Sequence, residues 1–88
     1  MAVTLDGAYV LNDQVALRPE PFGALAYHYG NRRLVFLKSE AIVDLVKRLG
    51  GHACLADAFT AAGIDAPRHP AFIAALSSLE ESEVICAR

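Results

Sequence analysis

Few residues of this 88-residue chain have the types and spacing that chemistry at a site requires. The three histidines and two cysteines are scattered singly, at His28, His52, His69, Cys54 and Cys86. Structural zinc sites usually bring their ligands in close pairs such as Cys-x-x-Cys, so this spacing predicts no metal site. The two thiols are expected to act as small apolar residues and not as a disulfide or redox pair. We therefore expect neither a metal nor a cofactor.

The remaining polar pairs do not predict catalysis. Ser77-Ser78 and Glu80-Glu81 have helical spacing on or beside a polar face, so we expect them to be exposed to solvent. A catalytic centre needs nucleophiles, acids or bases that converge in a pocket, and no local motif here predicts one. We therefore expect a protein that is not an enzyme.

The composition, with 55% hydrophobic and 20% charged residues, is that of one globular domain, expected over residues 1–88. No apolar run approaches the roughly 20 residues of a membrane-spanning helix, and the first residues do not resemble a secretory signal. These features predict a cytoplasmic protein without a membrane partner. A net charge of -2 gives no general attraction to nucleic acid. The single basic cluster, Arg32 and Arg33, is consistent with a solvated turn, with contact to an acidic peptide segment, or with contact to a partner enzyme.

Residues 14–38 are predicted to form a three-stranded antiparallel meander. Its strands are expected over residues 15–18, 22–29 and 34–38. Pro19 and Pro21 cannot donate ladder hydrogen bonds, so we expect them to mark a bend between the first two strands. Nothing after the third strand has the pattern of a fourth one. The third strand is therefore expected to keep an open edge.

The register of the hairpin follows from its turn. A two-residue Gly30-Asn31 loop would place Tyr27 opposite Leu34 and Leu25 opposite Phe36. Side chains alternate across a strand, so these four larger residues share one face. We expect this heavier face to be the one that the helices cover.

The rest of the chain is predicted to be an N-terminal arm (1–13), three helices (39–83) and a tail (84–88). The arm is expected either to pair as an edge strand at Val10 and Leu11 or to be loosely held. Ser39 should cap the first helix, the second should span about 55–62, and the third should run from about Asp65 or His69 to Ser82. The main apolar stripe of the third helix suits either a core or a docking surface, and consists of Phe72, Ile73, Leu76 and Leu79.

A meander followed by three helices predicts an α+β, winged-helix-like fold. This order of elements, without a catalytic constellation, resembles the RiPP recognition element, a PqqD-like domain that binds leader peptides. The match extends to particular residues. The run RPEPFGA (18–24), with YHYG (27–30) and LVFLK (34–38), is similar to the small peptide chaperones of mycofactocin biosynthesis.

The resemblance implies a protein with no reaction of its own, which binds a ribosomal precursor peptide and delivers it to a radical S-adenosylmethionine maturase. It also implies that the peptide adds as a strand to residues 34–38, in the cleft between this strand and the third helix. The peptide-binding residues would then be Arg33, Leu34, Val35, Phe36, Leu37 and Lys38 on one wall, and Ala71, Ala75, Leu76 and Leu79 on the other.

A winged-helix regulator that binds DNA is the alternative. Its third helix would enter the major groove, with the hairpin as a wing. Such a helix needs several basic or amide side chains, but this one has only Arg68 near its start and glutamates near its end. The sequence therefore favours a peptide partner over nucleic acid.

Overall fold

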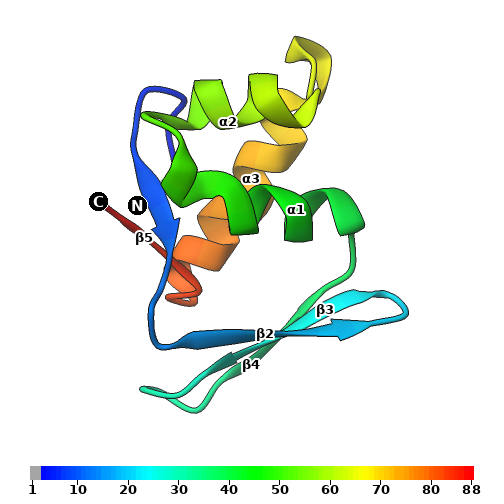
Figure 1. Ribbon diagram of the computed structural model, residues 1–88, viewed down its shortest axis with the longest axis vertical. Helices are drawn as coiled ribbons and strands as arrows, with labels where there is room; N and C mark the ends of the chain where they lie inside the picture. The colour runs from blue at the N-terminus through cyan, green and yellow to red at the C-terminus, as the bar shows by residue number, and fades with distance from the viewer. Residues whose placement is uncertain (1–2) are drawn as a thin grey trace.

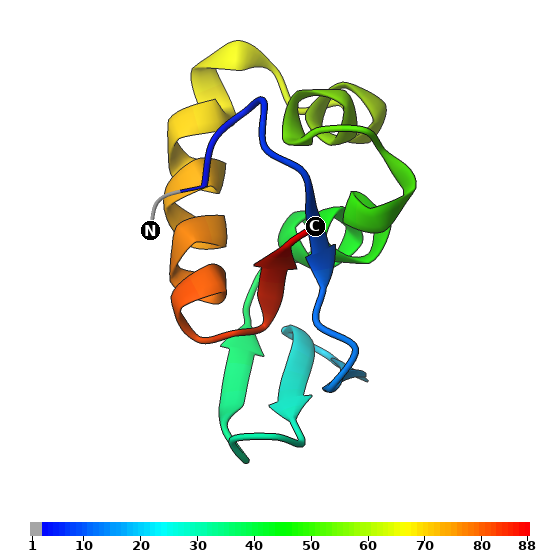
Figure 2. The same ribbon diagram turned by 90° about the vertical axis from the view of Figure 1, so that its left-hand side faces the viewer.

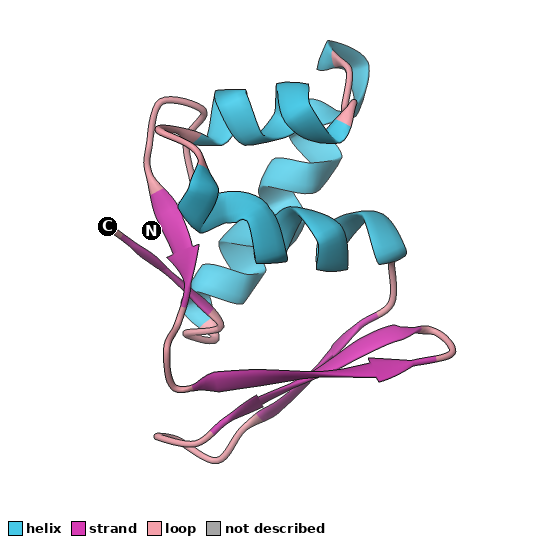
Figure 3. Cartoon of the chain, in the orientation of Figure 1, coloured by secondary structure: helices cyan, strands magenta, loops and turns pink. Residues whose placement is uncertain are grey.

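A computed structural model describes residues 3–88 and has an α+β fold. The three longer strands form one antiparallel sheet, and all three α-helices lie on one side of it (Figures 1 and 3). A second sheet joins the two ends of the chain. In chain order, the elements are β1 (Tyr9–Leu11), β2 (Val15–Glu20), β3 (Gly23–His28), β4 (Leu34–Leu37), α1 (Glu40–Arg48), η1 (Leu49–Gly51), α2 (Leu55–Ala62), η2 (Ala66–Arg68), α3 (His69–Glu81) and β5 (Ile85–Ala87).

The predicted register of the β3–β4 hairpin is confirmed. Tyr27 pairs with Leu34 and Leu25 pairs with Phe36. The predicted two-residue loop is wrong, because the turn has four residues between His28 and Arg33. A two-residue and a four-residue loop with the same centre bring the same residues opposite each other, so the error in the turn leaves the register unchanged.

The buried His28 side chain explains the wider turn. Its Nδ1 accepts hydrogen bonds from the backbone N–H groups of Gly30 and Asn31, at 3.0 and 3.1 Å. The loop closes when the Arg32 N–H donates to the His28 carbonyl at 2.8 Å, which places Arg32 at a φ of 61°. The side chain thus supplies an acceptor for two backbone donors at the turn.

The predicted choice of buried face is wrong. Ala24, Ala26 and Leu37 face the helices and are 1%, 1% and 3% exposed, whereas Leu34 and Phe36 on the opposite face are 56% and 60% exposed. Small alanine side chains let a helix approach the sheet closely, and α1 crosses the sheet on this side (Figure 1). The larger side chains are therefore left on the outer face.

Pro19 and Gly23 lie on either side of the turn between β2 and β3. Pro19 lies inside β2, paired with Ala24, and not in the predicted bend between β2 and β3. An edge strand tolerates proline because one side of its backbone makes no ladder bonds. Gly23 has a φ of 143°, and a Cβ atom there would collide with the Leu37 carbonyl oxygen. Only glycine suits both demands.

The helices agree with the predictions in place and capping. The Ser39 hydroxyl accepts a hydrogen bond from the Ile42 N–H at 3.4 Å, and α2 ends at Gly63 with a φ of 75°. A 3-10 turn leads into α3. The centre of the core consists of side chains from all three helices, from β5 and from the residue before it, of which the largest are Phe59, Leu45, Leu55, Leu76, Ile85, Val46 and Val84.

The two ends of the chain pair with each other. Val10 is opposite Cys86 and Leu11 is opposite Ile85, so the arm is a strand at the predicted residues (Figure 2). The expectation that no strand follows residue 38 is wrong, because β5 forms this pair. Residues 1 and 2 of the predicted arm lie outside the described residues.

Candidate peptide-binding groove

The edge of β4 carries backbone groups with no ladder partner. Within residues 3–88, the only strand beside β4 is β3. The His28 N–H donates to the Arg33 carbonyl at 3.0 Å, and hydrogen-bonded pairs alternate along an antiparallel ladder. The backbone groups of Val35 and Leu37 therefore point toward β3, whereas those of Leu34 and Phe36 point outward. An outward row of this kind is a template for another strand.

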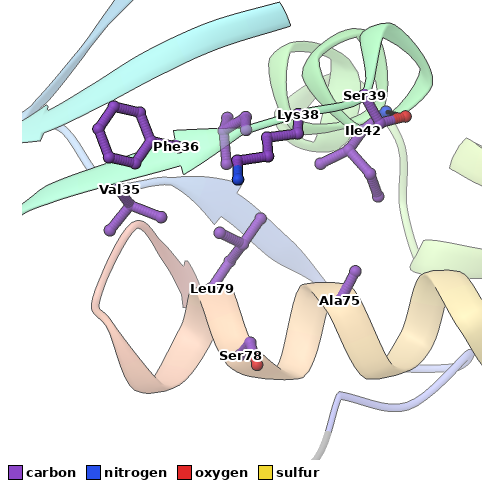
Figure 4. Close-up of a pocket in the computed structure, with 9 residues that line it drawn as sticks. Val35, Phe36, Lys38, Ser39, Ile42, Ala75, Ser78 and Leu79 are labelled. Atoms are coloured by element: carbon purple, nitrogen blue, oxygen red, sulfur yellow. Dashed lines mark hydrogen bonds between the residues drawn. The ribbon is translucent and has the colours of Figure 1, made fainter. Parts of the chain in front are cut away.

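An apolar groove lies beside this edge. A cavity of about 370 Å³ separates β4 from α3, with the start of α1 closing one end (Figure 4). A second hollow of about 190 Å³ shares part of the same lining and continues along α3. The larger cavity is lined by Val35, Phe36, Leu37, Lys38, Ser39, Ile42, Ala75, Ser78 and Leu79, and the smaller one by Ser39, Ile42, Ala71, Phe72 and Ala75.

The structure brings most of the predicted residues together. Six of them line the larger cavity and Ala71 lines the smaller one. Arg33 and Leu34 lie at the start of the same strand segment, beyond the lining. Leu76 does not line the groove, because its side chain is 0% exposed and belongs to the core. Helical geometry explains this, since Ala75 and Leu79 are four residues apart on one face while Leu76 is turned toward the core.

Four residues that line the groove are absent from the predicted set of peptide-binding residues. Ser39 was expected only to cap the first helix, but α1 starts directly after β4, so its first turn, with Ser39 and Ile42, closes the groove. Ser78 is solvent-exposed, as expected, and it lies on the groove wall. Phe72 lines the smaller hollow and is half-buried, consistent with both alternatives considered for it.

Charge is unevenly distributed along the chain. Residues 14–38 contain four of the eight basic residues but only one of the ten acidic residues. Arg33 and Lys38, at the two ends of β4, form no ion pair within residues 3–88, and the Lys38 side chain lies over the groove (Figure 4). The α3 helix, by contrast, has no lysine or arginine between His69 and Glu81. That composition is unlike a DNA-recognition helix.

The remaining polar side chains and thiols do not form a second site in the described part of the chain. The Ser77 hydroxyl, expected to face solvent, accepts a hydrogen bond from the Val3 N–H at 3.1 Å and so holds the N-terminal arm. Cys54 and Cys86 are free thiols, each half-buried. In the part of the chain that the structure describes, no three His, Cys, Asp or Glu side chains gather as metal ligands would. None of the helices there has the length and apolar character that crossing a bilayer requires.

An open strand edge beside an apolar groove is typical of domains that bind extended peptides. Comparison with known proteins agrees with this class. The chain belongs to the peptide chaperone MftB family, whose model matches residues 8–86.

Three relatives, each named peptide chaperone MftB, are similar over most of the chain. The relative from Mycobacterium ulcerans is 45% identical, over 91% of this chain and 73% of its own length. Those from Mycolicibacterium smegmatis and Mycobacterium tuberculosis are each 41% identical, over 91% and 94% of this chain and 78% and 76% of their own lengths. No solved structure matches significantly. A peptide chaperone has a non-catalytic role, in agreement with the prediction that this protein is not an enzyme.

Proposed function

We propose that this protein binds a ribosomal precursor peptide as an added strand on β4 and delivers it to a radical S-adenosylmethionine enzyme of mycofactocin biosynthesis. Membership of a peptide chaperone family supports the choice of ligand. The observation that carries the binding mode is the row of outward backbone groups at Leu34 and Phe36, directly beside an apolar groove. Main-chain hydrogen bonds and side-chain pockets are the two components of strand addition.

The two components have different energetic roles. Each added backbone hydrogen bond contributes about 0.5 to 1.5 kcal/mol, whatever side chain the peptide residue carries. The groove adds selectivity, because the Ala75 and Leu79 side chains on α3 and Ile42 on α1 offer only apolar surface to the peptide. Peptides with apolar residues at the groove-facing positions should therefore bind most tightly.

The shortness of β4 supports a delivery role. The strand has four residues, so it can pair with about 13 Å of an extended peptide. The rest of the peptide would remain outside the groove and accessible to another protein. Chemistry on that remainder needs a separate enzyme, as the non-catalytic role of the family requires.

A proline scan of β4 tests the binding mode. Phe36→Pro removes an outward N–H that makes no hydrogen bond to β3. In isothermal titration calorimetry it should lower the affinity for the precursor peptide by more than Phe36→Ala does. The alanine variant is the matched control, because it loses the same ring but keeps the N–H. Val35→Pro removes an inward donor and should instead disrupt the β3–β4 ladder itself.

The same titrations can contradict the proposal. If Phe36→Pro and Phe36→Ala bind the peptide equally, the N–H of residue 36 donates no hydrogen bond to the peptide, and strand addition to β4 is wrong. Amide NMR on both variants shows whether the sheet is intact, so a loss of folding is not mistaken for a loss of binding.

A further inference from the structure

The outer face of the sheet exposes large apolar side chains, of which only Phe36 also borders the groove. Phe22, Leu34 and Phe36 are 41%, 56% and 60% exposed. The rings of Phe22 and Phe36 pack edge to face, with their centroids 5.8 Å apart. Leu25 and Tyr27 lie next to Leu34 and Phe36 on the same face. A contiguous apolar patch on a small protein commonly marks a binding surface.

Strand addition brings the ligand to this face as well as to the groove. Residues opposite each other on neighbouring strands share a face, and successive residues alternate between faces. Peptide residues opposite Val35 and Leu37 would therefore point into the groove. Those opposite Leu34 and Phe36 would lie on the outer face. In Figure 4 the Phe36 ring lies on the side of β4 away from α3, whereas Val35 points toward α3.

We propose that the bound peptide is recognised on both faces, with alternate side chains in the groove and the intervening ones packed on Leu34 and Phe36. This inference rests on the proposed strand addition. It specifies the ligand as a continuous apolar segment, about four residues long, instead of one that alternates between apolar and polar residues. Phe22 has a positioning role, since its ring restrains the Phe36 ring before the peptide arrives.

Charge favours the peptide over a second copy of this chain as the occupant of the outer face. The segment 14–38 has a surplus of three positive charges, with four basic residues and one acidic residue. Arg33 and Lys38 flank β4, so two copies that met at this strand would bring like charges together, which opposes association. The oligomeric state is nevertheless measured in the test.

The test titrates the full chain with the precursor peptide and with peptide variants that carry serine at one position each. Phe36→Ser and Leu34→Ser should each weaken binding about tenfold, the loss expected for a truncated apolar contact, while both proteins stay folded because these side chains are largely exposed. Tyr29→Ser is the matched control. Tyr29 is 59% exposed but lies in the hairpin loop beyond the ladder, so its variant should bind like the unchanged chain.

Coupling between protein and peptide gives the sharper readout. Peptide binding by the Phe36→Ser variant should not weaken further when serine replaces a peptide residue on the outer face. Binding by Leu79→Ala should not weaken further when serine replaces a peptide residue that faces the groove. If Phe36→Ser and Leu34→Ser bind normally while Leu79→Ala weakens binding, the two-face inference is overturned and the groove remains the site. If none of the three alters binding, strand addition to β4 is wrong as well. If light scattering shows a dimer that Phe36→Ser abolishes, the outer face joins two copies and the inference is also overturned.

Discussion

The assignment of inner and outer sheet faces can be tested with two neighbouring alanine substitutions in β4. Leu37 is 3% exposed and packs against the core, so Leu37→Ala should reduce the free energy of unfolding by about 2 to 5 kcal/mol. Phe36 is larger but 60% exposed. Only about two fifths of its surface is removed from water, and full burial of such a side chain contributes about 1.5 to 3 kcal/mol. Phe36→Ala should therefore cost about 1 kcal/mol.

Urea denaturation followed by circular dichroism measures both values. A chain of this length has a total stability of roughly 4 to 13 kcal/mol, so Leu37→Ala could remove much of it, and an unfolded Leu37→Ala variant would agree with the structure. The sequence-based choice of buried face predicts the reverse order. A loss above about 3 kcal/mol for Phe36→Ala, together with a loss below about 1 kcal/mol for Leu37→Ala, would refute the face assignment.

Three further predictions concern the hairpin turn, the β2–β3 corner and the charges beside β4. His28→Ala leaves two backbone N–H groups without their acceptor and should cost about 1 to 3 kcal/mol in urea denaturation, whereas His28→Asn, which keeps an acceptor near Nδ1, should cost less. Gly23→Ala should cost more than about 1 kcal/mol by the same measurement, and a neutral result would contradict the steric conflict with β4. Arg33→Glu and Lys38→Glu should each lower the affinity for a synthetic apolar peptide with glutamates at its ends roughly fivefold, as measured by calorimetry. Arg18→Glu, on the far edge strand β2, is the control and should have little effect.

Local signals in the sequence were sufficient for the elements and their register. The cap at Ser39, the stop at Gly63 and the hairpin centre at Gly30 and Asn31 each depend on neighbours within a few residues. Even the turn type could be wrong without changing which β3 and β4 residues are paired. The open edge of β4 was predicted because nothing after residue 38 resembled a strand, and the edge is open although β5 follows, since β5 pairs with β1.

The choice of buried face depends on packing, which local patterns do not contain. Size favoured the face with Leu25, Tyr27, Leu34 and Phe36, whereas the helices pack on the alanine side, where the backbone can approach closely. The same limit applies to Leu76 on α3. Its place in the main stripe was compatible with both core and groove, and only the direction of the helix relative to β4 shows that it is a core residue.

The turn after α3 explains why the β4 edge stays open although a strand does follow. Glu83 has a φ of 64°, and the Val84 N–H donates to the Leu79 carbonyl at 2.9 Å, so the chain reverses sharply at the helix end. The Asn12 side chain donates to the Glu83 carbonyl at 3.0 Å, and the Asn12 N–H donates to the Val84 carbonyl at 2.9 Å. These bonds direct β5 to β1.

Pairing with β1 places β5 in the terminal sheet (Figure 2), so its backbone does not add to the β4 edge. A last strand that instead joined β4 would occupy the outward groups of Leu34 and Phe36 and cover the groove. The same contacts that hold the two ends of the chain together therefore preserve the edge that a peptide would need. The contacts between the two ends of the chain are not local in sequence, since Asn12 and Glu83 are 71 residues apart. For this reason the open edge could be predicted from the sequence, but the arrangement that keeps it open could not.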